Sequence, residues 1–504
     1  MKENILLKGF LLVLFTVSMN LMQAQEYNIL DYGAIDDSTK LSTRAIQKAI
    51  DECSANGGGV VKVPEGYYMI GTIFLKDNVN LHIESLGNLL GSTNLEDYSE
   101  EIHIPVEAPR FAKCMIFAEN VSNISVTGNG TINGRGSKAN FDHWGERPMH
   151  MRLVNCTNVL IEGVTIKNSA SWSTHLLFCE RVRVNGIYLY NRMQGNNDGI
   201  DFDGCKDLFI SNSKFDTDDD PICGKSTTSK ATENIVVTNC VIRSNCSGFK
   251  IGTSSKGVYR NITVSNCVMK DTYRGTIKLI CVDGGTIENV NISDIVMDNV
   301  EGPIFIRLGD RGKIYEEAKD QDYSKEGVDA IEETKPGKIK NISISNIRAN
   351  VGGKDSAQAG IMITGIPGHY VENVQINNVH VVFPGGGKKE YASRLVPEDA
   401  KRYPEQSFFG VLPSYALYAR HTKELYLNNV SFRYKDEERR PAIVTDDLQN
   451  SEIISLRVMS PKDGQPLVKL KNTRNLFIQN IRSLNNGTVE IEQGNDSIGV
   501  EVVN

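Results

Sequence analysis

A short phrase that recurs along the chain constrains its fold more than any other feature. Each copy has an aliphatic anchor, residues that alternate between polar and apolar, an Asn or Gly, and a second alternating run. Examples are NISVTG, NIVVTNCVI and NLFIQNIRS. Alternation of period two predicts β-strands. The early anchors lie 23 to 28 residues apart, at Val159, Val182, Leu208, Ile235, Ile262 and Val290.

Strand repeats of this length bury their apolar faces only by stacking. A leucine-rich horseshoe would show its own phrase and helical segments, and a propeller blade needs about forty residues. The sequence therefore predicts an all-β chain folded as a right-handed parallel β-helix. Near its start, Ser42 or Thr43 is placed to cap a short helix, AIQKAIDECSANGGG, that covers the open apolar end of the first coil.

Two insertions interrupt the repeat, near residues 309–337 and 384–410. Insertions in solenoid proteins form loops on one face, often the binding face. We expect residues 26–504 to form one β-helix catalytic domain. A walled pocket built by these loops would suit action at a chain end or on a branched substrate.

The first residues are typical of a signal peptide. Lys2 and Lys8 flank a short apolar run, Gly9–Met19, and small and polar residues follow up to Gln25. The run is too short to span a bilayer, and no second one follows it. We therefore expect residues 1–25 to be cleaved and the mature protein to be exported, to the periplasm or outside, with no membrane span.

Charge and cysteine usage limit the partners. A formal net charge of −7 provides no basic field for nucleic acid. All ten cysteines follow the signal peptide, and no spacing typical of a zinc site occurs. Their recurrence at Cys156, Cys179, Cys205, Cys240 and Cys267 predicts stacked, buried thiols rather than disulfides. Sequons at the repeated phrases predict asparagine ladders rather than glycosylation.

The repeat also allows possible site residues to be located. Residues at similar offsets from successive anchors should lie on neighbouring coils, about 4.8 Å apart. One such column gathers aromatic, carboxylate and cationic side chains, which is typical of a sugar-binding groove. Taken singly, each also fits a structural role, as a core aromatic, a satisfied histidine or a surface cation. The column comprises Trp172, His175, Asn196, Asp198, Asp219, Asp220, Ser247, Lys250, Arg274, Lys278 and Arg307.

The adjacent Asp219 and Asp220 carry the chemical argument. Two carboxylates about 4 Å apart repel by roughly 4 kcal/mol at an effective dielectric near 20, so one should hold a proton. Glycosidases use such a pair, with one acid protonating the leaving oxygen and another carboxylate acting as base or nucleophile. If both face the groove, the backbone must have a bulge or corner here. Two other interpretations fit the residue types as well. One is a solvated acidic turn, and the other is a calcium site that the turn forms with Asp198, Asp201 and Asp203. The turn comprises Asp216, Asp218, Asp219 and Asp220.

At these residues the sequence resembles glycoside hydrolase family 28, the polygalacturonase-like family. Asn196-Asn197-Asp198 matches its Asn-x-Asp motif, and Asp219-Asp220 matches its Asp-Asp motif. The resemblance implies inversion, with Asp219 as the general acid and Asp198 and Asp220 activating water. It also implies an acid-to-base separation of about 6.5–9.5 Å. The implied substrate is a pectin-type, galacturonate-containing glycan of plant cell walls, with no cofactor and no metal.

Two family segments depart from the pattern. Cys246-Ser247-Gly248 stands for the family's Gly-His-Gly, and Thr276-Ile277-Lys278 stands for its Arg-Ile-Lys. The histidine and the arginine are absent, which leaves substitutes such as Arg274, Lys250 or Arg307 for holding a substrate carboxylate. Two other functions therefore stay open. One is a calcium-dependent polysaccharide lyase on the same fold, and the other is a glycan-binding β-helix without turnover. The pattern does not set the oligomeric state.

Overall fold

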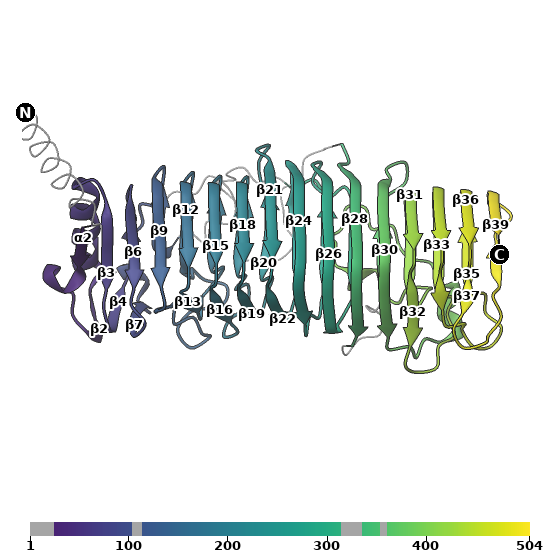
Figure 1. Cartoon of the computed structure of the whole chain (residues 1–504), viewed down its shortest axis with the longest axis horizontal. Helices are drawn as coiled ribbons and strands as arrows, with labels where there is room; N and C mark the ends of the chain where they lie inside the picture. Colours follow the sequence, from purple (N-terminus) through teal and green to yellow (C-terminus); the bar gives the residue numbers. More distant parts are fainter. Residues whose placement is uncertain (1–24, 103–112, 314–334, 353–359, 504) are drawn as a thin grey trace, which may run out of the picture.

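The computed structural model describes residues 25–102, 113–313, 335–352 and 360–503, and within them the chain is a long parallel β-helix (Figure 1). Every registered pair of its strands is parallel. The predicted fold is therefore confirmed. Most of the predicted signal peptide, residues 1–24, and the central part of the first insertion, 314–334, lie outside the described residues. No helix within the described ranges is long and apolar enough to cross a membrane.

Each coil contributes to three faces, which we call the front, ladder and site sheets. The front sheet faces the viewer in Figure 1. It comprises β1 (Glu26–Asn28), β3 (Gly59–Val63), β6 (Val79–Ile83), β9 (Ser122–Gly128), β12 (Thr157–Glu162), β15 (Glu180–Asn185), β18 (Lys206–Ser211), β21 (Thr232–Thr238), the first parts of β24 (Val258–Lys270), β26 (Thr286–Val300), β28 (Lys338–Val351) and β30 (Val371–Phe383), the second parts of β31 (Leu417–Asn428) and β33 (Ile443–Ile454), and then β36 (Arg474–Gln479) and β39 (Ile498–Val503).

The ladder sheet follows the front sheet in each coil. It comprises β2 (Asp37–Leu41), β4 (Gly66–Ile70), β7 (Gly87–Gly91), β10 (Thr131–Asn133), β13 (Thr165–Lys167), β16 (Tyr188–Asn191), β19 (Lys214–Thr217), β22 (Val241–Ser244), the second parts of β24, β26, β28 and β30, and then β32 (Ser431–Tyr434), β34 (Arg457–Val458) and β37 (Arg482–Ser483).

The site sheet completes the coil and carries the candidate residues. It comprises β5 (Ile73–Phe74), β8 (Cys114–Glu119), β11 (Met149–Val154), β14 (Thr174–Leu177), β17 (Ile200–Asp203), β20 (Ile222–Ser226), β23 (Phe249–Ser255), β25 (Ile277–Cys281), β27 (Ile304–Leu308), β29 (Ile361–Thr364), the first parts of β31 and β33, and then β35 (Val468–Lys471) and β38 (Ile491–Gln493).

The interior is filled by aliphatic side chains stacked coil upon coil. Val182 pairs in register with Val159 and with Leu208, and the anchors continue upward in the same way. Val290 pairs with Ile342, although 52 residues separate them in the sequence, so the first insertion leaves the stack unbroken. Because alternate residues of each strand point inward, the period-two pattern of the sequence becomes this buried core.

The predicted N-terminal helix is present as α2 (Thr43–Ala55). Ala45, Ile46, Ala49, Ile50 and Cys53 form its buried face, which covers the first coil (Figure 1). The predicted capping role of the preceding hydroxyls is wrong. Ser42 makes no side-chain cap, because its Oγ exchanges hydrogen bonds with the backbone of Ile35. Thr43 instead accepts a bond from the Gly71 amide at 3.0 Å.

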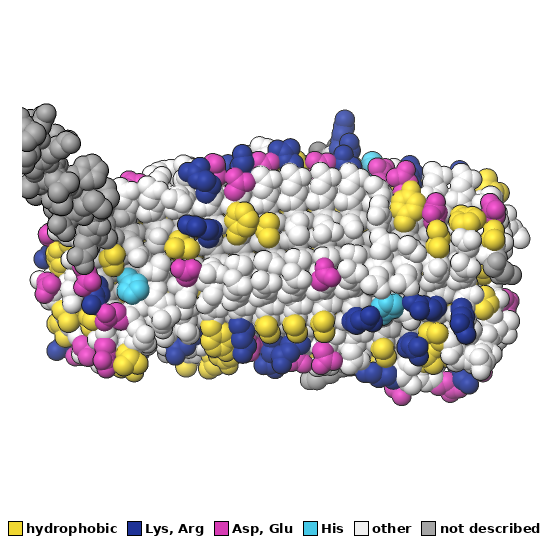
Figure 2. Space-filling model, in the orientation of Figure 1, with side chains coloured by type: hydrophobic (Ala, Val, Ile, Leu, Met, Phe, Trp, Pro, Cys, Tyr) yellow, Lys and Arg dark blue, Asp and Glu magenta, His cyan; other side chains and the backbone are white. Residues whose placement is uncertain are grey.

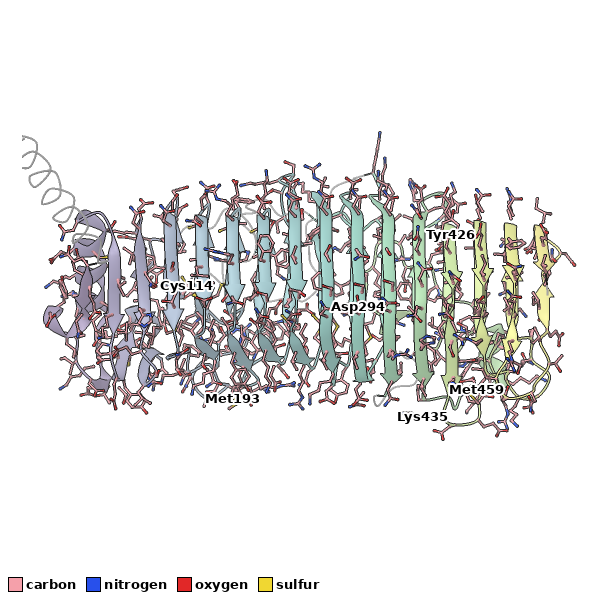
Figure 3. The ribbon with its side chains drawn as sticks, in the orientation of Figure 1. Cys114, Met193, Asp294, Tyr426, Lys435 and Met459 are labelled. Atoms are coloured by element: carbon pink, nitrogen blue, oxygen red, sulfur yellow. The ribbon has the colours of Figure 1, made fainter. Side chains whose placement is uncertain are left out.

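Asparagine ladders follow the corners of the coils, as the sequence predicts. Asn261 donates through Nδ2 to Asn234 at 3.1 Å and accepts from Asn289 at 3.3 Å. Its φ of 58° lies in the left-handed region, which Asn tolerates better than other residues with a Cβ. A second ladder runs where the front and ladder sheets meet, through Asp294, which is labelled in Figure 3 and accepts from Asn346 at 3.0 Å.

We expect Asn261→Ala to lower the free energy of unfolding by about 1–2 kcal/mol. Alanine is strained in the left-handed backbone conformation, and the variant loses both ladder hydrogen bonds. Asn261→Gly removes the same bonds but tolerates the backbone, so it should cost less. Chemical denaturation of the two variants beside the wild type measures the difference. A glycine variant as unstable as the alanine variant would show that the backbone conformation contributes nothing.

The described cysteines are free and buried, which confirms the prediction of buried thiols. They form more than one stack. Cys156, Cys179 and Cys205 precede three paired front-sheet strands, whereas Cys240 and Cys267 stack beside the ladder sheet.

The second insertion lies against the outside of the site sheet. It contains two short 3-10 helices, η5 (Lys389–Ser393) and η6 (Gln406–Phe409). Val396 and Phe409 pack with Phe305, Met362 and Tyr418, which point outward from β27, β29 and β31. The coils on the C-terminal side of the candidate site are therefore covered.

Candidate active site

The three aspartates lie at the corner where the ladder sheet turns into the site sheet. Asp198 precedes β17, and Asp219 and Asp220 occupy the turn between β19 and β20. The two turns stack, because the Gly199 amide donates to the carbonyl oxygen of Asp220 at 2.9 Å. The sequence predicted a bulge or corner if Asp219 and Asp220 both face the groove, and the structure has a corner at this position.

The carboxylates approach one another closely. One oxygen each of Asp198 and Asp220 and the Cys223 sulfur lie within 4.8 Å of one another. An oxygen each of Asp219 and Asp220 and the Cys246 sulfur are equally close. The separation of about 6.5–9.5 Å expected between the acid Asp219 and the carboxylates that activate water stays a prediction.

Asp220 is held as an anion. It is 3% exposed, its Oδ1 accepts from the Ser247 hydroxyl at 2.5 Å, and its Oδ2 accepts from the Lys250 ammonium at 2.5 Å. Burial alone would raise its pKa, but Lys250, Lys278 and the bond from Ser247 hold the pKa well below its usual range.

Asp219 and Asp198 are shifted in the opposite direction. Burial and the adjacent Asp220 charge raise the pKa of Asp219, against the opposing charge of Lys250. Burial, then Asp201 and Asp219, raise the pKa of Asp198 well above its usual range. Neighbouring carboxyls with opposite shifts are what acid–base catalysis requires.

Two further residues complete the cluster. Lys225 lies 3.6 Å from the Asp198 carboxylate and 3.3 Å from that of Asp201, which is fully buried. The sequence reasoning missed Lys225, and it considered Asp201 only as a ligand of a calcium site. Counting from anchors placed Asp198 level with His175, but Asp201 is the true register partner of His175. The turns differ in length from coil to coil, so equal offsets do not give equal positions.

Trp172 and His175 lie beneath this cluster rather than at its surface. Trp172 is 9% exposed, and the Lys225 ammonium sits 4.1 Å from the centre of its ring. His175 is buried and accepts a bond from Arg152 at Nδ1. Burial, Arg152 and Lys225 lower its pKa well below the usual value, so it is neutral. This geometry supports a positioning role for both, and their predicted contact with substrate stays untested.

The remaining predicted cations differ in their surroundings. Lys278 is fully buried and donates to Glu405 of the second insertion at 2.7 Å. Arg274 is exposed at the mouth of the site. Burial would lower its pKa, but Cys246 and the carboxyls of Asp219, Glu405 and Asp220 raise it. No ion pair of Arg274 occurs among the described residues, and its contact with a substrate stays a prediction.

Asn196 and Arg307 have structural contacts. The Asn196 side-chain oxygen accepts from Arg147 at 3.2 Å, and its φ is 51°. Arg307 is buried, and its guanidinium donates to the carbonyls of Glu398 and Asp399 in the second insertion. Burial and Arg420 lower its pKa to about 10. Arg307 therefore anchors the insertion, and the structure does not bring it to the aspartates.

The donor atoms suit a metal poorly. Each close group offers two carboxylates and one thiol, whereas calcium takes six to eight oxygen ligands. Burial raises the pKa of Cys223 and of Cys246 well above the usual value, so both thiols hold their protons. Two neighbouring acids are separately engaged, since Asp216 of β19 pairs with Arg192 and Arg243, and Asp218 accepts a bond from Asn245.

Comparison with known families decides the relationship. A model described as glycosyl hydrolases family 28 matches residues 53–401, more than half of the 504-residue chain. The chain belongs to glycosyl hydrolases family 28. The resemblance seen in the two aspartate motifs is thereby confirmed.

Relatives within and around family 28 are distant. A probable polygalacturonase from Vitis vinifera is 27% identical over 321 residues, covering 60% of this chain and 61% of that protein. An exo-poly-alpha-D-galacturonosidase from Dickeya chrysanthemi is 29% identical over 248 residues, covering 39% and 41%. The chain thus matches less than two thirds of the length of either. The crystal structure of a hyperthermoactive exopolygalacturonase from Thermotoga maritima shares the fold, with a TM-score of 0.63, 24% identity, and 81% and 92% coverage.

The structure shows what occupies the two altered family 28 segments. Ser247 stands where the family's histidine was expected, and its hydroxyl bonds Asp220. Lys278 keeps the lysine of the other segment, but Glu405 neutralises it. Glu405 lies 127 positions from Lys278 in the sequence, so the local motif did not predict this pair.

Proposed function

We propose that this chain is an inverting glycoside hydrolase that acts on pectin-type, galacturonate-containing glycans. The observation that carries the proposal is the opposite shift of two adjacent carboxyls, in which Asp219 gains proton affinity and Asp220 loses it. Family membership supports the reaction class.

In the proposed reaction, Asp219 donates its proton to the glycosidic oxygen, and the bond from that oxygen to the anomeric carbon breaks. A water molecule forms the new bond to this carbon from the opposite face. Asp220, an anion, orients the water together with Asp198. The raised pKa of Asp198 makes it the better acceptor of the proton that the water loses.

The second insertion supports action near a chain end. Glu405 reaches Lys278, and Tyr403 lies close enough to Lys250 that the two influence each other's pKa. The same insertion covers β25 to β31 on the outside. A bound glycan then extends from the aspartates toward the N-terminal coils alone. We propose, too, that the protein is exported, on the basis of its N-terminal residues.

The test is hydrolysis of polygalacturonan, its methyl ester, oligogalacturonides and rhamnogalacturonan, with products followed by NMR. The proposal expects reducing ends whose first anomer is inverted, and short products from one end of the chain. A retained anomer would refute inversion. An unsaturated product lost on chelation would identify a lyase, and glycan binding without turnover would identify a binding protein.

We expect Arg274→Gln to raise the KM for oligogalacturonides about tenfold or more, because a charge-assisted hydrogen bond to a substrate carboxylate is lost. The kcat should change less, since Arg274 does not carry the reacting proton. Methyl-esterified oligomers serve as the control, because they offer no carboxylate. An equal rise of the KM for both substrates would show that Arg274 does not bind the substrate carboxylate.

A further inference from the structure

A row of cations follows the outer surface of the ladder sheet in the C-terminal third of the protein. Arg348, His380, Ser431, Arg457 and Arg482 occupy successive rungs, each in register with the next. Arg433 lies two residues beyond Ser431 on the same strand and the same face. We call Arg348, His380, Arg433, Arg457 and Arg482 the cation ladder.

The ladder is visible as dark blue side chains around a cyan histidine at the lower right of Figure 2. Its rungs are about 4.8 Å apart. Arg348, Arg433 and Arg482 are exposed, while His380 and Arg457 are half-buried. Arg457 donates to Asn429 at 2.5 Å, and His380 Nε2 lies 2.9 Å from the Asn378 side-chain oxygen.

The cation ladder differs from other outward cations of the solenoid in its pairing. Elsewhere on the solenoid, outward cations pair with acids on the neighbouring coil, as Lys340 does with Glu288 and Arg260 with Glu233. Within the described residues, no member of the cation ladder forms an ion pair. Like charges on adjacent rungs repel. The ladder therefore carries an uncompensated positive charge on a chain whose net charge is −7.

The effect of this crowding is seen at His380. Burial lowers its pKa first, and the charges of Arg348 and Arg457 lower it further. An anion bound along the row would relieve the repulsion among its arginines. The row follows the axis of the solenoid from coil to coil, so the fitting ligand is an extended chain with regularly spaced negative charges.

We propose that the cation ladder is a second binding surface, separate from the active site, for a linear polyuronate. A polyuronate carries one carboxylate per sugar, and its sugars repeat at a spacing comparable with the rungs. The choice of polyuronate over other polyanions rests on the proposed function. Lys214 is a ladder-sheet residue on the same coil as Asp219. Arg348 lies four rungs beyond Lys214, which is about 19 Å along the axis. A polymer held there stays near the active site between cuts.

The test uses the full chain with Arg348→Gln, Arg457→Gln and Arg482→Gln combined, in an Asp219→Asn background that prevents degradation. Affinity electrophoresis through de-esterified polygalacturonan measures binding at low and high salt. We expect the dissociation constant to rise about tenfold or more and its salt dependence to weaken. The control combines Arg44→Gln, Arg181→Gln and Arg183→Gln, which remove the same charge from exposed positions on α2 and β15 and should bind as before.

A second variant guards against loss of folding. The three arginines replaced by lysine keep the charge and should retain most of the binding. Unchanged binding of the glutamine variant overturns the proposal, and so does equal binding to methyl-esterified polymer. Tighter binding to DNA or to anionic vesicles than to polygalacturonan overturns the choice of ligand.

The outcome separates this inference from the proposed function. If the wild-type protein cuts no pectic glycan but its binding depends on the cation ladder, the second binding surface is supported and the proposed hydrolase is refuted. Hydrolysis of a short oligogalacturonide at the wild-type rate by a protein with the three glutamine substitutions and an intact Asp219, together with lost polymer binding in the Asp219→Asn background, supports both. If the protein hydrolyses the glycan but its polymer binding does not depend on the cation ladder, only the second binding surface is refuted.

Discussion

Asp219→Asn is expected to lower kcat on the cleaved glycan by about 10²–10⁴-fold, the usual contribution of a general acid. Asparagine has the shape of the protonated acid but no proton to give to the leaving oxygen. Reducing-end release by the two proteins measures the loss. Asp218→Asn is the matched control, because Asp218 is the preceding acid of the same turn and bonds Asn245. A loss confined to Asp219→Asn supports the role.

Stability measurements distinguish this loss from unfolding. The pKa of Asp219 is raised in the folded state, so the stability it provides is present below its unfolded pKa and is lost as the pH rises through the folded pKa. Above the folded pKa the ionised side chain destabilises the fold, and Asp219→Asn removes this destabilisation. The variant should unfold at a temperature no lower than the wild type. Inactivity together with a much lower unfolding temperature would leave Asp219 without support as the acid.

Lys250→Met is expected to lower the free energy of unfolding by about 3–5 kcal/mol, because it leaves the buried charge of Asp220 without its ion-pair partner. Both partners are nearly inaccessible, at 6% and 3% exposed, so solvent screening reduces the effect little. Chemical denaturation near neutral pH measures it. Lys270→Met, on an exposed lysine of the ladder sheet, is the control and should stay within about 0.5 kcal/mol.

The same variant should also change the pH dependence of the protein. The pKa of Asp220 is depressed in the folded state, so its contribution to stability is present above the unfolded pKa and is lost as the pH falls through the folded pKa. Without Lys250 that pKa rises, and the acid limb of kcat/KM should move to higher pH. An unmoved acid limb would contradict the role of Lys250 in holding Asp220 as the anion.

The fold was predictable because the coil repeats itself. The aliphatic anchors identified by spacing are register partners in the structure, and the asparagines expected to form ladders do so. Each inference needed one period of sequence and the requirement that apolar strand faces be buried.

The candidate site was predictable in part. Asp198 comes together with Asp219 and Asp220 because their turns lie on neighbouring coils. Their surroundings were not predictable by counting, because turns of unequal length shift the register of the site sheet. Asp201 consequently takes the place assigned to Asp198 beside His175. The contact between Lys278 and Glu405 joins segments that no repeat relates.

The asparagine ladders bear on the choice of a host for producing this protein. Sequons begin at Asn123, Asn261 and Asn341, and in the folded coil the Nδ2 atom of each donates to the coil before it. N-linked glycosylation attaches sugar to that same atom. A eukaryotic secretory pathway that modifies the chain before its coils stack would block the ladder, so we expect such material to fold poorly beside protein from a bacterium.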